Sequence, residues 1–247
     1  MKPLPKSLFS ILLLIPVSSF AANETIQSFS KAKKILEREV YQDHRTTLYC
    51  GAEFDDKKLV TAPEGFATDK YIKRSKKIEW EHVVPAENFG QTFKEWRDGD
   101  TQCVNSKGKE FKGRRCAEKI NLEYRYMQSD MFNLYPAIGA VNALRSNYNF
   151  TMQPSEESDF GSCEMKIADR KAEPPARARG RIARTYLYMD DTYKRYNMSR
   201  QQKQLMGAWD KMYPVDSWEC LRAKRISELQ NSKNNIVQSR CVAQDLW

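Results

Sequence analysis

The chain contains only two histidines, His44 and His82, and their settings differ. His44 lies in the polar stretch 42–45, which is typical of solvated surface, so we expect it to take no part in chemistry. His82 lies in the segment Ile78-Glu79-Trp80-Glu81-His82-Val83-Val84-Pro85-Ala86. A neutral imidazole there could take a proton from an attacking nucleophile near pH 7. No HExxH pair of the zinc-protease type is present.

The segment around His82 would bring two carboxylates together if it is extended. Side chains alternate along a strand, so Glu79 and Glu81 would share one face, with His82 on the other. Hard divalent cations such as Mg²⁺ take carboxylate oxygens as ligands. Glu81 and His82 could serve one phosphate only if the strand bends or ends here, which the following Pro85 permits. These residues alone do not decide whether His82 acts as a base or is a hydrogen-bonded structural residue.

The pattern of apolar residues predicts a helix-rich α+β fold in one domain. Short strands are expected over 46–84, and residues 97–119 are polar and glycine-containing, as in an irregular excursion or a stapled hairpin. Helical spacing or capping residues predict the remaining elements. These are a helix over roughly 29–41, one capped by Asp130 with Pro136 in its first turn or at a break, a basic helix after Pro174-Pro175, and one capped by Ser199.

The first 21 residues have the features of a signal peptide. Lys2 and Lys6 precede the apolar stretch Leu8–Val17, and Ser19-Phe20-Ala21 offers small residues for cleavage. The apolar stretch is shorter than the about 20 residues of a membrane span. We therefore expect residues 1–21 to be removed, and residues 22–247 to form one exported domain in the periplasm or outside the cell, without a membrane anchor.

Six cysteines fit an exported protein. Their even number, without a CxxC pair, indicates disulfides rather than a zinc or redox site. The most local candidate is Cys103 with Cys116, which would staple a glycine-containing loop. Pairing of the other four is left open: Cys50, Cys163, Cys220 and Cys241.

The net charge of +9 should attract polyanions. Four arginines of the basic helix are candidates for phosphate contacts, which carry no sequence information. Helical spacing does not allow all four to share one face. A solvated helix face with some arginines paired to carboxylates is the alternative. The four are Arg177, Arg179, Arg181 and Arg184.

Four segments, in order, resemble the endonuclease I family of periplasmic and secreted nucleases, which use a ββα-metal, or His-Me finger, site. The resemblance covers nearly all of the mature chain. The segments are Glu79–Ala86, Asp130–Gly139 continuing through Val141-Asn142 to Asn147, Glu173–Tyr186, and Trp209–Pro214 with Trp218–Cys220.

The resemblance implies a site with one divalent cation, Mg²⁺ or another such as Mn²⁺. It implies Glu81 and Asn133 as ligands, His82 as the base that activates water, and Glu79 as a residue that orients them. The implied activity is sequence-nonspecific hydrolysis of double- and single-stranded DNA to 5′-phosphate products, with RNA as a further candidate substrate. The nucleic acid would bind through its phosphate backbone, and we expect a monomer.

The chain departs from the family pattern at three places. Relatives often have a histidine where Phe132 stands, and many have a phosphate-holding arginine where Thr101 follows Gly99-Asp100. Arg97, nearby, is a candidate substitute. The Cys-Gly-Cys expected near Cys50 is Cys50-Gly51-Ala52, and Cys116 lies in an insertion, where it could replace a lost partner of Cys103.

Three other functions compete with this prediction. A noncatalytic protein that coats DNA would respond to salt and not to removal of metal. A Ser-His-Asp hydrolase built on His82 would need a nucleophile elbow, and the chain has no Gly-x-Ser-x-Gly. A disulfide-stapled inhibitor or structural protein would not explain four family segments in order.

Overall fold

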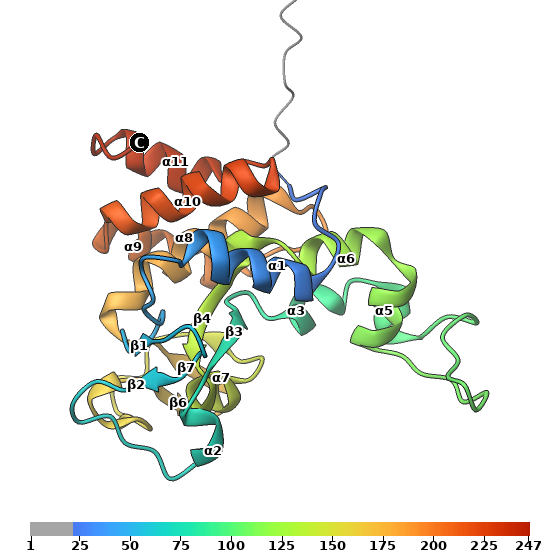
Figure 1. Cartoon of the computed structure of the whole chain (residues 1–247), viewed down its shortest axis with the longest axis horizontal. Coiled ribbons are helices and arrows are strands. Elements are labelled where there is room, and N and C mark those ends of the chain that lie inside the picture. Colours follow the sequence, from blue (N-terminus) through green and yellow to red (C-terminus); the bar gives the residue numbers. More distant parts are fainter. Residues whose placement is uncertain (1–21) are drawn as a thin grey trace, which may run out of the picture.

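The computed structural model describes residues 22–247 (Figure 1). The expected signal peptide, residues 1–21, lies outside the described residues. Within 22–247, no helix is both long enough and apolar enough to cross a membrane.

The described chain combines eleven α-helices with three small sheets. The helices are α1 Phe29–Ile35, α2 Ile72–Ser75, α3 Ala86–Gly90, α4 Lys94–Arg97, α5 Arg114–Ile120, α6 Leu122–Gln128, α7 Gly139–Arg145, α8 Ala176–Thr192, α9 Arg200–Met212, α10 Ser217–Gln230 and α11 Asn235–Val242. The strands are β1 Glu53–Phe54, β2 Val60–Thr61, β3 Ile78–His82, β4 Leu134–Ile138, β5 Asn149–Phe150, β6 Lys166–Ala168 and β7 Lys171–Glu173. Three further turns are the π-helical η1 Leu36–Val40 and the 3-10 turns η2 Met131–Asn133 and η3 Gly161–Cys163. The α+β fold is as predicted.

The four longest α-helices of the described residues lie together on one side of the central strands. Figure 1 shows α8–α11 stacked on one side of β3 and β4, and the small sheets with α2 at the opposite end. The apolar side chains of α8 face inward, and both Tyr186 and Met189 are fully buried. Of the apolar stripe on α9, Met206 and Trp209 are buried, whereas Met212 is exposed. The Ser199 hydroxyl accepts a hydrogen bond from the Gln202 N–H, so the predicted cap is present.

Strand β4 replaces the first half of the helix that we predicted after Asp130. Asp130 caps only the short turn η2, and residues 134–138 then pair antiparallel with β3, with Pro136 opposite Trp80. Proline lacks an N–H donor but is compatible with a two-stranded sheet, which has only edge strands. The Pro136 carbonyl instead accepts a hydrogen bond from the Leu48 N–H at 2.8 Å. Helix α7 therefore begins only at Gly139, and β3, β4 and α7 together form a ββα unit.

A buried polar cluster fixes the turn that leads into β4. The Asp130 carboxylate accepts hydrogen bonds from the hydroxyls of Tyr188 and Tyr193 and from the Gln230 amide. Burial raises the pKa of Asp130, while these donors oppose the rise. Three elements distant in the sequence are thereby joined next to β4.

Three disulfides join the described cysteines. Cys103 is bonded to Cys116, the local pair suggested by the sequence. This disulfide closes the base of the excursion, a loop that projects from the body of the molecule beside α5 (Figure 1). The remaining pairs, which the sequence left open, are Cys50–Cys163 and Cys220–Cys241.

Candidate active site

A cleft of about 380 Å³ lies where β3 ends and meets α7. Side chains from α1, β3, α3, α4, α5 and α7 line it. The lining residues are Phe29, Trp80, Glu81, His82, Pro85, Ala86, Glu87, Trp96, Arg114, Asn142, Ser146 and Asn147. Glu81 and His82 both border this cleft because β3 ends at His82 and the chain turns away there.

The His82 ring is held in one tautomer. Its Nε2 lies 2.8 Å from the carbonyl oxygen of Gln128, which can only accept, so Nε2 carries the proton. The lone pair is therefore on Nδ1. Burial, followed by the positive charge of Arg114, lowers the pKa of His82 to about 3. The imidazole is consequently neutral at pH 7, with Nδ1 unprotonated.

The Glu81 carboxylate is buried and held from behind by two donors. Its Oε1 accepts hydrogen bonds from the Tyr49 hydroxyl at 2.8 Å and from Arg145 Nη1 at 2.7 Å. Arg145 is fully buried, and it also donates to the backbone carbonyls of His82 and Val83. Burial raises the pKa of Glu81, and the charge of Arg145 opposes the rise. Because these bonds fall on Oε1, Oε2 retains its capacity to bind a ligand.

Glu79 positions Asn142 at the rim of the same cleft. Its Oε2 accepts a hydrogen bond from Asn142 Nδ2 at 2.8 Å, and Arg74 Nε donates to its Oε1 at 2.7 Å. Gly139 permits this approach, since a Cβ there would lie 3.0 Å from Glu79 Oε1 and 2.6 Å from the Arg74 carbonyl. The bond through Nδ2 leaves the Asn142 amide oxygen free to bind a ligand. This contact supports the role expected of Glu79, which is to orient another residue.

Asn133, which the resemblance implied as a metal ligand, is not among the residues that line the cleft. It is fully buried, and its side-chain amide forms two hydrogen bonds with the backbone of Val84. The Val84 N–H donates to Asn133 Oδ1 at 2.7 Å, and Asn133 Nδ2 donates to the Val84 carbonyl at 2.9 Å. The residue therefore fixes the chain where it leaves β3. Asn142 and Asn147 are the amides that border the cleft with Glu81 and His82.

The other single residues considered above lie away from the cleft. Arg97 donates to the Gln91 carbonyl at 2.6 Å, and Thr101 lines a separate hollow beside the excursion. Phe132 is buried edge-on against Tyr188. His44 stacks on Trp218 with ring centroids 4.0 Å apart, and burial lowers its pKa. None of the four borders the cleft with His82.

Three of the four arginines proposed for phosphate binding are instead ion-paired within the fold. Arg184 is buried and binds Glu219 through two hydrogen bonds, at 2.7 and 2.6 Å, and Asp210 at 3.2 Å. Arg179 pairs with Glu173, and Arg181 with Asp216. Arg177 is exposed, with its guanidinium over Gly51. Partner carboxylates, two of them on neighbouring helices, take up the charge of these three arginines, so the structure favours the alternative of a helix face paired to carboxylates.

We predict that Arg184→Ala lowers stability rather than specific activity. The substitution leaves two buried carboxylates without their partner, which costs about 3–5 kcal/mol. For a domain of this size, we expect Tm to fall by roughly 10 °C. Thermal denaturation checks this, with Arg200→Ala as a control because Arg200 is exposed. Weaker DNA binding at an unchanged Tm would restore Arg184 as a phosphate contact.

The residues of the cleft fit a divalent cation held mainly by neutral ligands. Among residues 22–247, no group of three or more His, Cys, Asp or Glu is arranged to hold a metal. Glu81 Oε2 and the Asn142 amide oxygen are the oxygen donors that the surrounding hydrogen bonds leave free. Two such ligands suit Mg²⁺, which usually keeps several waters and binds one or two protein groups with substrate phosphate.

A neutral histidine, a buried carboxylate and an amide border one cleft on the ββα unit, an arrangement that suits a hydrolase. Comparison with known proteins gives the family. The model of the family "Endonuclease I" matches residues 25–241, and the chain belongs to this family of nucleases.

Relatives match over nearly their full length. An "Extracellular deoxyribonuclease" of Aeromonas hydrophila is 38% identical over 96% of this chain and 99% of its own. A "Periplasmic deoxyribonuclease" of the same species is 37% identical over 95% of each chain. "Endonuclease-1" of Buchnera aphidicola subsp. Acyrthosiphon pisum is 35% identical over 90% of this chain and 85% of its own. With the three disulfides, these locations confirm a protein of the periplasm or the extracellular space.

Sequence reasoning missed three residues of the site: Tyr49, Asn142 and Arg145. Asn142 and Arg145 lie in the family-like segment that ends at Asn147, three residues apart on α7. Their spacing would put both on one side of a helix. That signal became usable only once β4 was seen to pair with β3, which brings this helix to the end of β3.

Proposed function

We propose that the protein is a metal-dependent endonuclease that hydrolyses DNA phosphodiesters without sequence preference and leaves 5′-phosphate ends. The observation that carries this proposal is that His82, with an unprotonated Nδ1, lines the same cleft as Glu81 and Asn142, each of which has an oxygen free to bind a ligand. The names of the Aeromonas relatives support DNA as the substrate. RNA is a second candidate, because contacts to the phosphate backbone do not by themselves distinguish the sugar. One copy contains the whole cleft, so we expect an active monomer.

His82 acts as the general base in this proposal. Nδ1 takes a proton from a water that attacks the phosphorus, while the Gln128 carbonyl holds the ring through Nε2. The resulting imidazolium would be stabilised by that bond. Tyr49 and Arg145 keep Glu81 in place, and Glu79 keeps Asn142 in place. Glu81 and Asn142 would hold one Mg²⁺ or Mn²⁺, which supplies charge stabilisation for the phosphate and the leaving 3′ oxygen.

Lysine side chains that could contact the backbone of the nucleic acid lie next to the cleft. A second hollow shares Phe29, Trp80 and Asn142 with the cleft and is also lined by Lys33 and Lys34 of α1. Its carboxylates, Glu37 and Glu79, are already ion-paired with Lys58 and Arg74. No carboxylate among residues 22–247 pairs with either lysine in an ion pair. We propose that these lysines, rather than the arginines of α8, contact phosphates of the strand beside the scissile bond. Such contacts attract any sequence equally.

The proposed function predicts cleavage that depends on a divalent cation. Purified, oxidised protein incubated with supercoiled plasmid and Mg²⁺ should give nicked and then fragmented DNA. EDTA should abolish the cleavage, and excess Mg²⁺ should restore it. A gel of the plasmid checks this. Retarded but intact plasmid, insensitive to EDTA and released by salt, would contradict the proposal and favour a noncatalytic binder.

A further inference from the structure

Residues 103–112, the excursion hairpin, project from the molecule in a shape that several interactions fix. The Phe111 N–H donates to the Cys103 carbonyl at 2.8 Å, and the disulfide to Cys116 closes the base. At the turn, Asn105 Oδ1 accepts hydrogen bonds from two backbone N–H groups, at 2.9 and 3.0 Å. The side chains at this turn are therefore presented to the solvent from a constrained backbone.

The excursion hairpin concentrates positive charge. Between Cys103 and Cys116 the chain has five cations and one carboxylate, that of Glu110. Three lysines at the turn and just after it are exposed, and none of them forms an ion pair with a carboxylate among residues 22–247. They are Lys107, Lys109 and Lys112. Like charges held close together repel each other, and a polyanion relieves that repulsion. The hairpin therefore suits a polyanionic partner.

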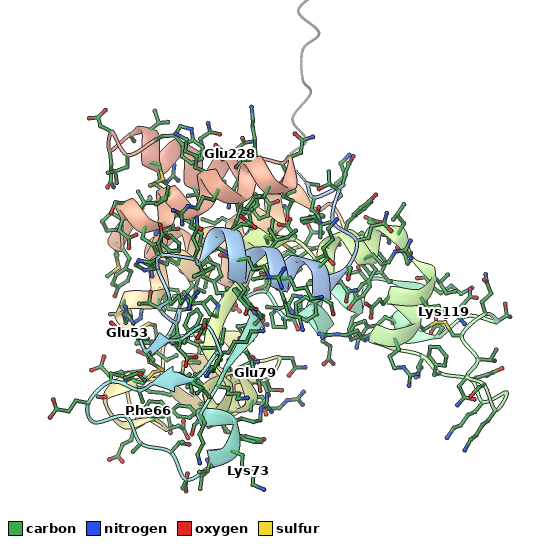
Figure 2. The ribbon with its side chains drawn as sticks, viewed as in Figure 1. Glu53, Phe66, Lys73, Glu79, Lys119 and Glu228 are labelled. Atoms are coloured by element: carbon green, nitrogen blue, oxygen red, sulfur yellow. A yellow bond between two sulfur atoms is a disulfide. The ribbon has the colours of Figure 1, made fainter. Side chains whose placement is uncertain are left out.

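The base of the excursion hairpin lies at the cleft. Trp96 lines the cleft, and its carbonyl accepts a hydrogen bond from the Gly113 N–H at 3.0 Å, directly after the hairpin. Figure 2 shows Lys119 on α5 near this base, with the hairpin projecting beyond it and Glu79 of β3 nearer the centre of the molecule.

The reach of the excursion hairpin can be compared with the spacing of DNA phosphates. An extended chain from Cys103 to Lys107 spans at most about 14 Å. Phosphates along one strand are about 3.4 Å apart along the helix axis, so this reach corresponds to roughly four base pairs. Duplex DNA is stiff over such a length. A duplex seated in the cleft and running toward the excursion would therefore meet the lysines several base pairs from the cut.

We propose that the excursion hairpin is an arm that binds the phosphate backbone of duplex DNA outside the cleft, several base pairs from the scissile bond. The inference rests on the proposed function and adds a binding surface to it. A lipid surface fits the hairpin less well, because insertion into a membrane interface needs an apolar face. Val104 is the one exposed large apolar residue between Cys103 and Cys116.

Two triple variants test this surface. Each replaces three exposed lysines that form no ion pair by alanine, so both remove the same charge. The hairpin variant combines Lys107→Ala, Lys109→Ala and Lys112→Ala. The control variant combines Lys211→Ala, Lys224→Ala and Lys233→Ala, on and after α9 and α10, which lie across the molecule from the excursion in Figure 1. Because all six side chains are exposed, both variants should keep the Tm of wild type.

Binding is measured in a His82→Ala background, where the DNA stays intact. Near 0.1 M salt, the hairpin variant should bind a duplex of about 20 base pairs roughly 10- to 100-fold more weakly than the control variant. Its slope of log affinity against log salt should be smaller by about two to three, as expected for three lost phosphate contacts. Arginine at the same three positions should keep the affinity, because the charge remains. In the active enzyme, the loss should appear in KM rather than in kcat, since the three lysines do not line the cleft.

Equal affinities and salt slopes for the hairpin and control variants would overturn the proposal. It would also be overturned if the hairpin variant lost binding to vesicles of anionic phosphatidylglycerol while its DNA binding stayed at the control level. That result would assign the hairpin to a membrane surface. Neither result bears on the proposed function, which the Mg²⁺-dependent cleavage of plasmid by the wild-type protein tests separately.

Discussion

Replacing His82 by alanine is expected to lower the single-turnover rate of DNA cleavage by about 10³-fold, within the range that loss of a general base produces. The physical reason is that Nδ1 is the free basic nitrogen of the ring, and alanine offers no acceptor for the proton of the attacking water. Binding of duplex DNA, measured by fluorescence anisotropy in Ca²⁺ or EDTA, should stay within a few-fold of wild type.

A second substitution at the same position separates the base from the hydrogen bond to Gln128. The His82→Gln side chain can still donate an N–H toward that carbonyl but cannot act as a base near pH 7. We expect it to be as inactive as His82→Ala while recovering some of the stability lost with the bond, which is about 1–3 kcal/mol for a buried carbonyl left unpaired. Wild-type turnover in either variant would exclude His82 as the base.

Asn142→Ala and Asn133→Ala should fail in different ways. Loss of Asn142 removes a proposed ligand, so the Mg²⁺ concentration for half-maximal cleavage should rise at least tenfold, by analogy with the losses seen when groups around a metal are removed. Its Tm should change little because the side chain lies at the cleft. Loss of Asn133 instead leaves the Val84 N–H and carbonyl unpaired in the interior, at a cost of about 1–3 kcal/mol for each group.

Two measurements on each variant, thermal denaturation and the Mg²⁺ dependence of cleavage, make this comparison. Thermal denaturation without metal should place Asn133→Ala well below wild type and Asn142→Ala close to it. The activity of folded Asn133→Ala should keep the Mg²⁺ dependence of wild type. If the metal requirement shifts in Asn133→Ala and not in Asn142→Ala, Asn133 is the ligand after all, and the hydrogen bonds to Val84 must open when metal binds.

The sequence predictions that the structure confirms were based on local patterns. The α+β class follows from apolar spacing and turn residues. The extended segment that ends at His82 follows from alternation and from the proline after Val84. Glu81 and His82 were expected to share a cleft only if the strand bends or ends near them, and it ends at His82. These features depend on residues close together in the chain, so one sequence contains the information.

The errors concern interactions between distant segments. Asn133 and Asn142 lie in one family-like segment, and which amide meets Glu81 depends on the antiparallel pairing of β4 with β3. That pairing was missed because Pro136 suggested the first turn of a helix. The arginines of α8 look like a phosphate-binding surface until Asp210 and Glu219, on other helices, are seen to pair with Arg184. Arg114 lies in an excursion whose path no local pattern indicates.

The central claim is that water, activated by His82, attacks phosphorus and releases the 3′ oxygen. The most direct measurement is cleavage of a defined DNA duplex by the wild-type protein with Mg²⁺ in oxygen-18-labelled water, followed by mass spectrometry of the fragment ends. We predict one labelled oxygen in each new 5′-phosphate and an unlabelled 3′-hydroxyl. Label in a 3′-phosphate would contradict this direction of cleavage, and intact DNA would contradict the proposed function itself.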